Sequence, residues 1–182
     1  MWGVIVTLIV GCEVGFWVLL AAGLGVRYGL RMPRTGLALL LCEPLLEVVL
    51  LVVTAIDLKH GGRADWRHGL AAVYIGCTVG LGHATVSWAD ARVAHRFAGG
   101  PPPVRPPRYG RARAVHEWRV AARWTLACVV ALALLQAAIW YVGADGDTGS
   151  LRAWQLRMVW LIGINVVVAG SYTLFPKRER AR

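Results

Sequence analysis

Residues Thr35 to Leu58 read TGLALLLCEPLLEVVLLVVTAIDL, an apolar stretch long enough to cross the roughly 30 Å hydrocarbon core of a bilayer. Glu43 and Glu47 interrupt this stretch, and Thr54 and Asp57 follow them. The spacing of these polar residues places all four on one side of an α-helix. An ionisable group at membrane depth costs a few kcal/mol and faces a protein interior or a water-filled cavity. The sequence therefore predicts an integral membrane protein with a buried acidic centre.

The composition is that of a protein with several membrane helices. Hydrophobic residues make up 57% of the 182 residues, nine residues are Trp, and the mean hydropathy is +0.54. A soluble domain has fewer apolar residues than this. We expect a single all-α membrane domain, a polytopic helix bundle of about five transmembrane helices. The predicted spans are residues 2–26, 35–58, 69–88, 120–143 and 158–175.

The distribution of Lys and Arg predicts the orientation in the membrane. Arginines without an acidic residue among them follow the first span in residues 27–34, many arginines lie in residues 89–119, and Lys and Arg outnumber Glu in residues 176–182. The other two connections mix both signs of charge more evenly: Lys59, Arg63 and Arg67 with Asp65, and Arg152 with Asp145 and Asp147. Because cytoplasmic loops hold an excess of positive charge, we expect the amino terminus outside and the carboxyl terminus inside a bacterial cytoplasmic (inner) membrane. The same bias explains the net charge of +10. The expected partner of these charges is the bilayer with its anionic inner leaflet, and we expect no nucleic acid.

Residues 89–119 form a basic, Pro-rich cytoplasmic loop that is too short and too poor in aliphatic residues to be a separate domain. Ala89 to Phe97 is expected to continue the third helix, and Gly99 to Pro107 to break it, because successive prolines remove hydrogen-bond donors. Arg111 to Arg119 is expected to begin the next helix. Arginines of this loop are predicted to contact either lipid headgroups or a cytosolic or membrane protein: Arg105, Arg108, Arg111 and Arg113.

Two pairs of glycines predict close helix packing. Gly11 and Gly15 lie in the first span, and Gly76 and Gly80 lie in the third. Small residues four apart allow the backbones of two membrane helices to approach closely. The packing is expected within one chain or across a homodimer, and we expect the chain to form a homodimer. In the third span the same face continues to His83.

Depth along the helices allows four ionisable residues to meet. At about 1.5 Å per residue, Glu13 and Glu47 lie near mid-membrane, and Glu43 and His83 lie nearer the cytoplasmic side. Clustered carboxylates in a low dielectric are expected to retain protons, and a histidine exchanges its proton near neutrality. Pro44 leaves a helix carbonyl without its donor, so we expect a kink or local opening there. The four residues suit the binding of protons or small cations; alternatively, they only hydrogen-bond neighbouring helices.

No pattern in the sequence indicates an enzyme or a cofactor. The four cysteines, Cys12, Cys42, Cys77 and Cys128, occur singly in separate spans and lack closed zinc spacing. They are expected to be buried thiols and no metal is predicted, although a soft metal site assembled in three dimensions stays an alternative. Serine-nucleophile, phosphate-loop and zinc-protease motifs are absent from the sequence.

Three segments carry a resemblance to a known family: HGLAAVYIG, GHATVSWADARVAHRFAGGPPPVRPPRYGRARA and SYTLFP. They resemble segments of small, uncharacterised membrane proteins typical of GC-rich actinobacterial genomes. This resemblance covers most of the chain and implies no particular activity. The first span, LIVGCEVGFWVLLAAG, is similar to small multidrug exporters in the placement of Glu13. That likeness covers one helix and implies a proton-coupled role for Glu13.

Two functions follow as expectations. The first is proton-coupled transport or permeation of a small cation, with Glu43 and Glu47 as the principal site, Glu13 as a further carboxylate and His83 as the proton partner. The second is a non-transporting scaffold or accessory subunit that binds its partner through the cytoplasmic loop.

Overall fold

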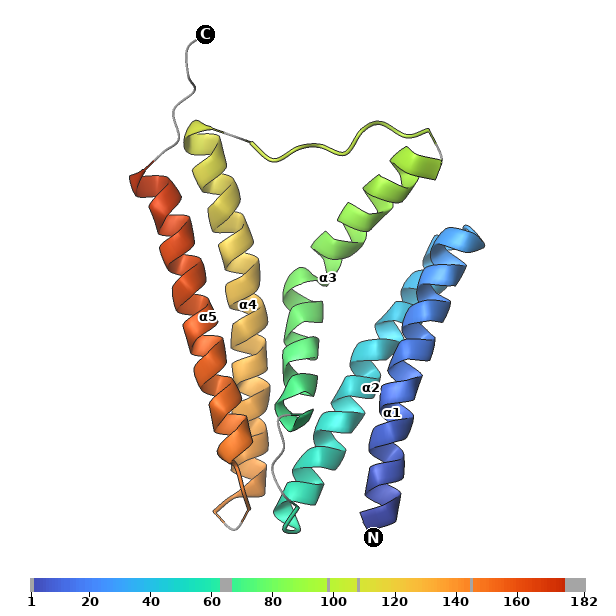
Figure 1. Cartoon of the computed structure of the whole chain (residues 1–182), viewed down its shortest axis with the longest axis vertical. Helices are drawn as coiled ribbons and strands as arrows, with labels where there is room; N and C mark the ends of the chain where they lie inside the picture. The colour runs from blue at the N-terminus through green and yellow to red at the C-terminus, as the bar shows by residue number, and fades with distance from the viewer. Residues whose placement is uncertain (1, 63–66, 98, 108, 145, 176–182) are drawn as a thin grey trace. The chain divides into compact units, whose positions relative to one another are not determined.

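The computed structural model describes residues 2–62, 67–97, 99–107, 109–144 and 146–175, but not the side chains of residues 2–10, 12, 13, 67 and 68. The described residues form helices and loops and contain no strand, which confirms the predicted all-α class (Figure 1). In chain order the elements are α1 (Trp2–Leu24), the π-helical turn η1 (Gly25–Gly29), α2 (Pro33–Lys59), α3 (Arg67–Phe97), α4 (Gly110–Val142) and α5 (Gly149–Leu174).

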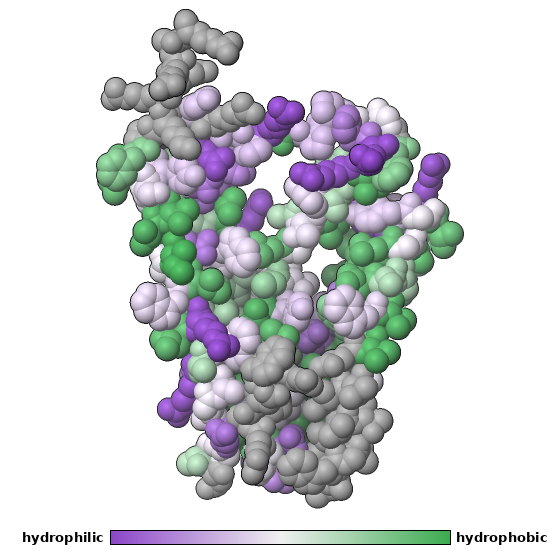
Figure 2. Space-filling view, in the orientation of Figure 1, coloured by the Kyte–Doolittle hydropathy of each residue, from purple (hydrophilic) through white to green (hydrophobic). Residues whose placement is uncertain are grey.

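The lengths and compositions of these helices are those of membrane spans. Four qualify within the described residues: Pro33–Lys59, Gly69–Phe97, Gly110–Val142 and Gly149–Leu174. The part of the first helix whose side chains are described is a shorter apolar helix, Val14–Gly29. Hydrophobic side chains cover much of the surface of the helices (Figure 2). On α5, for example, Val167 is 71% exposed, and lipid is the solvent in which such exposure costs little. The chain is thus a polytopic helical membrane protein.

The chain divides into two compact units. Unit 1 contains Met1–Ile75 and Leu132–Trp154, and unit 2 contains Gly76–Ala131 and Gln155–Arg182. The borders fall inside α3, α4 and α5, so each of these helices contributes one part to each unit.

In unit 1, α1 and α2 form an antiparallel hairpin. The turn between them is the π-helical η1, in which the Leu30 amide donates to the Gly25 carbonyl at 3.2 Å. Pro33 begins α2, where its missing amide hydrogen costs nothing. A Cβ added to Gly36 would lie 2.8 Å from the backbone of Arg27, so only glycine permits this approach. The hairpin therefore depends on backbone contact at its turn.

The far end of α2 terminates in a Schellman motif. Gly61 has a φ of +87°, its amide donates to Leu58 at 3.3 Å, and the amide of Gly62 donates to Asp57 at 2.9 Å. The Leu58 side chain is fully buried, as are those of Leu135 and Leu151 from the α4 and α5 parts of unit 1. This apolar core fixes the end of the helix that carries the two glutamates.

In unit 2, α3 and α4 pack through glycines. Gly76 is buried, and a Cβ added to Gly80 would lie 2.6 Å from the Arg123 carbonyl oxygen. The Cβ added to Gly80 would also lie 2.8 Å from the Cβ of Ala127. The two backbones are in direct contact here, as small residues at membrane-helix interfaces allow.

The end of α3 and the start of α4, on either side of the Pro-rich loop, lie where the sequence predicted them. As predicted, α3 continues to Phe97 and helical structure resumes at Gly110. Gly99 has a φ of +64°, and the Gly100 amide turns back to the Ala94 carbonyl at 3.0 Å. The last helix differs in length from its predicted span, because α5 begins at Gly149 and is continuous through Arg157.

Gly80→Ala is expected to destabilise the protein by about 1–3 kcal/mol, because the added methyl group overlaps the α4 backbone. The matched control is Gly82→Ala on the same helix, where the nearest atom to a new Cβ is 3.7 Å away. Thermal unfolding in detergent, followed by circular dichroism, measures both. An equal change in melting temperature for the two variants would contradict the α3–α4 contact.

Candidate functional site

The polar side chains of α2 lie on its sheltered side. Glu47 is 9% exposed and Thr54 is 3% exposed, whereas Glu43 and Asp57 are half-buried. The opposite side of the helix is open, as shown by Leu45, which is 66% exposed. The helix thus turns its polar stripe toward protein and its apolar residues outward, as an acidic membrane helix requires.

Glu43 is the most unusual member of this stripe. Its Oε1 atom is buried and has no hydrogen-bond partner within the described part of the chain. Most buried polar atoms in proteins are paired, so an unpaired carboxylate oxygen calls for an explanation such as a bound ion or a proton. Glu47, one turn further along, does make a polar interaction. The two glutamates therefore have different environments although they share a helix face.

Pro44, between the two glutamates, does not interrupt the helix. The structure gives α2 as one α-helix from Pro33 to Lys59, with Pro44 inside it. Of the two alternatives that we expected at this position, the local opening is absent and the kink stays a prediction. The proline still has no amide hydrogen, so it offers no donor to the carbonyl one turn earlier.

The hairpin brings the backbone of α1 alongside this stripe. A Cβ on Gly15 would lie 3.4 Å from Leu46, and one on Gly23 would lie 2.8 Å from Leu40. Because the two helices are antiparallel, this register puts the backbone of residue 13 within about one helical turn of Glu47. The Glu13 side chain itself lies outside the described side chains. Gly11, by contrast, has no atom within 4 Å of an added Cβ.

His83 lies in unit 2, whereas Glu43 and Glu47 lie in unit 1. Its side chain is exposed, and its carbonyl accepts a hydrogen bond from the Ser87 hydroxyl at 2.8 Å. The partnership of His83 with the glutamates stays a prediction.

The described residues hold no group of three His, Cys, Asp or Glu side chains placed to bind a metal ion. Cys77 is half-buried and Cys128 is buried in unit 2, but Cys42 on α2 is exposed, contrary to our expectation of a buried thiol. The Cys42 thiol donates to the Ala38 carbonyl at 3.3 Å. Cys12 is among the residues whose side chains are not described.

Unit 2 contains a second candidate site, a cavity of about 870 Å³ where the end of α3, the Pro-rich loop and the start of α4 meet. We call it the loop cavity. Its lining combines arginines and histidines with a tryptophan, a valine and prolines: Trp88, Arg92, His95, Arg96, Pro103, Val104, Arg105, Pro106, Pro107 and His116. Hydrophilic side chains also gather at this end of the surface in Figure 2.

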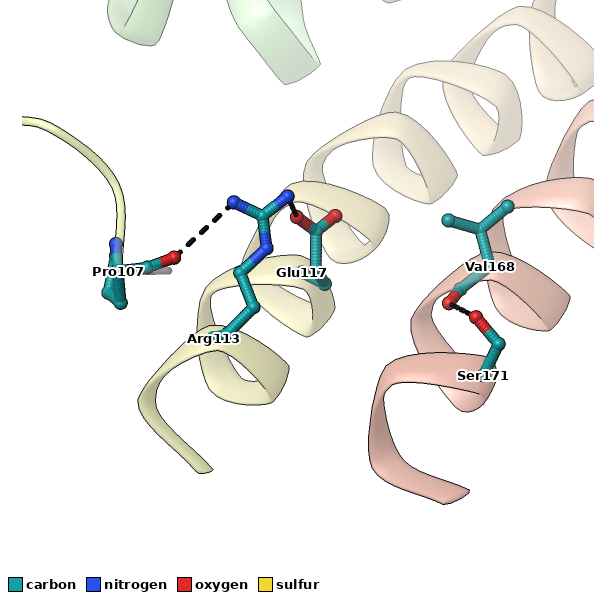
Figure 3. A network of polar contacts seen from close by, with 5 residues as sticks. All are labelled: Pro107, Arg113, Glu117, Val168 and Ser171. Carbon is teal, nitrogen blue, oxygen red and sulfur yellow. Dashed lines mark hydrogen bonds and ion pairs between the residues drawn. The ribbon is translucent and has the colours of Figure 1, made fainter. Parts of the chain in front are cut away.

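Arg113 fastens the end of the loop to α4. It pairs with the Glu117 carboxylate one turn later, and its Nη1 donates to the Pro107 carbonyl at 3.4 Å (Figure 3). Its guanidinium also lies 5.1 Å from the centre of the Tyr172 ring on α5. Beside it, the Trp118 indole donates to the Thr173 hydroxyl at 2.9 Å. The start of α4 is thus bound to the end of α5 within unit 2.

The four loop arginines predicted to contact lipid or a partner occupy different positions. Arg105 lines the loop cavity, Arg113 is used within the fold, and Arg111 is exposed. Arg108 lies outside the described residues. Among the lining residues that the sequence analysis did not select are Trp88, Arg92, Arg96 and His116. The sequence contains one sign of this site: Trp88, Arg92 and Arg96 are four residues apart, which places them on one helix face.

Comparison with known proteins finds a relative that matches nearly the whole chain. The chain is 34% identical over 179 residues to "Uncharacterized membrane protein YmcC" of Bacillus subtilis (strain 168). The match covers 96% of this chain and 94% of that protein. No family model and no solved structure matches the chain. The actinobacterial origin and the exporter likeness of the first span stay predictions.

Arg113→Gln is expected to loosen the start of α4, because the change removes the ion pair with Glu117 and the contact with the Tyr172 ring. Losing a partly buried, charge-assisted contact costs roughly 1 kcal/mol, equivalent to amide exchange about threefold to tenfold faster. Hydrogen–deuterium exchange of residues 110–117 measures this. Arg111→Gln, which removes the same charge from an exposed position, serves as control. Equal exchange in both variants would refute the role of Arg113.

Proposed function

We propose that this chain, which belongs to the family of the Bacillus subtilis membrane protein YmcC, acts in proton-coupled transport, or in permeation of a small cation, through the acidic stripe of α2. The proposed site consists of Glu43 and Glu47, with Glu13 as a further carboxylate and His83 as a proton partner. The protein is proposed to act without catalytic chemistry or a cofactor, in the bacterial inner membrane.

The observation that carries this proposal is the buried Oε1 atom of Glu43, which has no hydrogen-bond partner among the described residues. A glutamate that only joined helices would satisfy both of its oxygens with donors on its neighbours. A glutamate that takes up and releases a proton or cation needs a free oxygen for part of its cycle. The buried Glu47 one turn away supplies a second carboxylate, and two such close groups titrate as a coupled pair.

The proposal places two copies of the chain side by side. Gly11 presents an open surface on α1, with no atom within 4 Å of an added Cβ. The backbone of a second copy fits against such a small-residue position. A dimer contact there would lie close in sequence to Glu13 and would shelter its surroundings from lipid.

The rival proposal is a scaffold that binds a protein through its cytoplasmic loop. It draws support from the hydrogen bonds that hold both ends of the loop, at Gly100 and at Pro107. An ordered loop binds a partner at a lower entropic cost than a disordered one does. Under this proposal the acidic stripe serves packing alone.

Glu43→Gln combined with Glu47→Gln is expected to abolish ion flux, because amides neither release protons nor neutralise a cation. The measurement uses purified protein in sealed liposomes containing a pH-sensitive dye, with imposed proton or potassium gradients. The wild type should dissipate a gradient, and the double variant should match protein-free liposomes.

The control for this experiment is Asp147→Asn, which removes a carboxylate from an exposed position outside the helices yet keeps the oxygen that accepts from the Gly149 amide. It should retain the wild-type flux. Gel filtration and circular dichroism establish that all variants are folded. Wild-type flux in a folded double variant, or no flux from the wild type under either gradient, would count against transport and favour the scaffold.

A further inference from the structure

The Pro-rich loop that lines the loop cavity is held in place at both of its ends. At the start of the loop, the Gly100 amide donates to Ala94, and the His95 ring Nδ1 lies 2.9 Å from the Gly100 carbonyl oxygen. At its end, Arg113 donates to Pro107. Residues 100–107 include five prolines, which restrict the backbone. The walls are therefore preformed, which lowers the entropic cost of binding a ligand.

The lining of the cavity is strongly basic. Three guanidinium groups, of Arg92, Arg96 and Arg105, line it together with two histidines, and no carboxylate is among its described lining residues. Arg96 and Arg105 make no hydrogen bond or ion pair within the parts of the chain that are described. The nearby carboxylate of Glu117, next in sequence to His116, is already neutralised by Arg113. Among the described lining residues, the positive charge of the cavity is therefore not balanced by a carboxylate.

Trp88 gives the cavity an apolar wall and positions one of the arginines. The Arg92 guanidinium lies 4.1 Å from the centre of the Trp88 ring. A guanidinium held over a ring in this way keeps its in-plane N–H donors available. Pro103, Val104 and Pro106 add further apolar lining. The cavity therefore offers donors for an anion beside a surface for carbon atoms.

From this arrangement we infer that the loop cavity binds a phosphate ester, with the phosphate held by Arg92, Arg96 and Arg105 and the apolar part of the ligand against Trp88 and the prolines. Guanidinium groups match the geometry of phosphate oxygens through paired hydrogen bonds. The volume of about 870 Å³ lies within the range of small-molecule sites and exceeds the needs of a bare phosphate ion.

The phosphate ester has two sources, an anionic phospholipid headgroup or a soluble nucleotide. The cavity lies at the end of the membrane-spanning helix α3, where tryptophan and arginine are typical of the membrane interface. This position favours the lipid. The site is distinct from the acidic stripe of α2, and the binding inference stands whether or not that stripe conducts ions.

The test measures ligand binding to the purified full-length protein in a non-ionic detergent by native mass spectrometry. The probes are dioctanoyl phosphatidylglycerol, dioctanoylglycerol, which has the same chains without phosphate, and adenosine 5′-diphosphate. We expect one phosphatidylglycerol per chain and no comparable binding of dioctanoylglycerol. Binding of the nucleotide instead would support the site and identify a soluble ligand. Failure of both phosphate probes to bind would overturn the inference.

Two triple variants with the same loss of charge locate the site. The cavity variant combines Arg92→Gln, Arg96→Gln and Arg105→Gln. The control combines Arg111→Gln, Arg119→Gln and Arg123→Gln, at exposed positions that do not line the cavity. The cavity variant should bind about tenfold more weakly or worse, because paired charge-assisted hydrogen bonds are lost, and the control should stay within about threefold of wild type.

An equal loss of affinity in the two triple variants would overturn the inference, because diffuse attraction between charges would then explain the binding. Arg105→Gln alone covers the case in which the cavity variant does not fold, since this residue lies in the loop and makes no hydrogen bond or ion pair within the described residues. It should weaken phosphatidylglycerol binding by roughly threefold or more. Unchanged affinity in Arg105→Gln would contradict the inference.

Discussion

The structure depends on keeping the carboxylates of α2 away from lipid. A helix that carries Glu43 and Glu47 inside an apolar stretch is stable in a bilayer only if other helices cover its polar side. The hairpin with α1 supplies part of that cover, and the backbone contact between Gly36 and Arg27 makes the hairpin tight. The outward side, which includes the 66% exposed Leu45, is then free to meet lipid. The need to keep the carboxylates from lipid therefore explains both why the stripe is sheltered and why the opposite side of the helix is apolar.

Unit 2 meets a different requirement, the attachment of a charged loop to membrane helices. Its helices approach closely at Gly76 and Gly80, where any Cβ would overlap the α4 backbone. At the end of the unit that carries the loop, Arg113 joins the loop to α4 (Figure 3). Its guanidinium also lies against the Tyr172 ring of α5. These contacts use Arg113 structurally, whereas Arg96 and Arg105 at the loop cavity make no hydrogen bond or ion pair among the described residues.

Periodicity was sufficient to predict the helices, because stretches of about 20 apolar residues have few other interpretations. It also predicted the stripe on α2, since Glu47 and Thr54 are buried on one side as their spacing required. The loop cavity was harder to predict, because Trp88 and His116 are far apart in sequence. They line one cavity because the chain turns at Gly99. Local rules failed at Cys42, which is exposed. At Pro44 the helix stays continuous, so the expected local opening is absent, while the expected kink stays a prediction.

Oxygen accessibility along α2 would test the sheltered stripe most directly. Spin labels placed one at a time at positions 39–56 of a cysteine-free protein in liposomes report by electron paramagnetic resonance how readily molecular oxygen, which concentrates in lipid, reaches each residue. The account predicts a helical period with minima at Glu43, Glu47 and Thr54 and maxima near Leu45 and Val52. Maxima at the two glutamate positions would place these side chains in lipid and contradict the account.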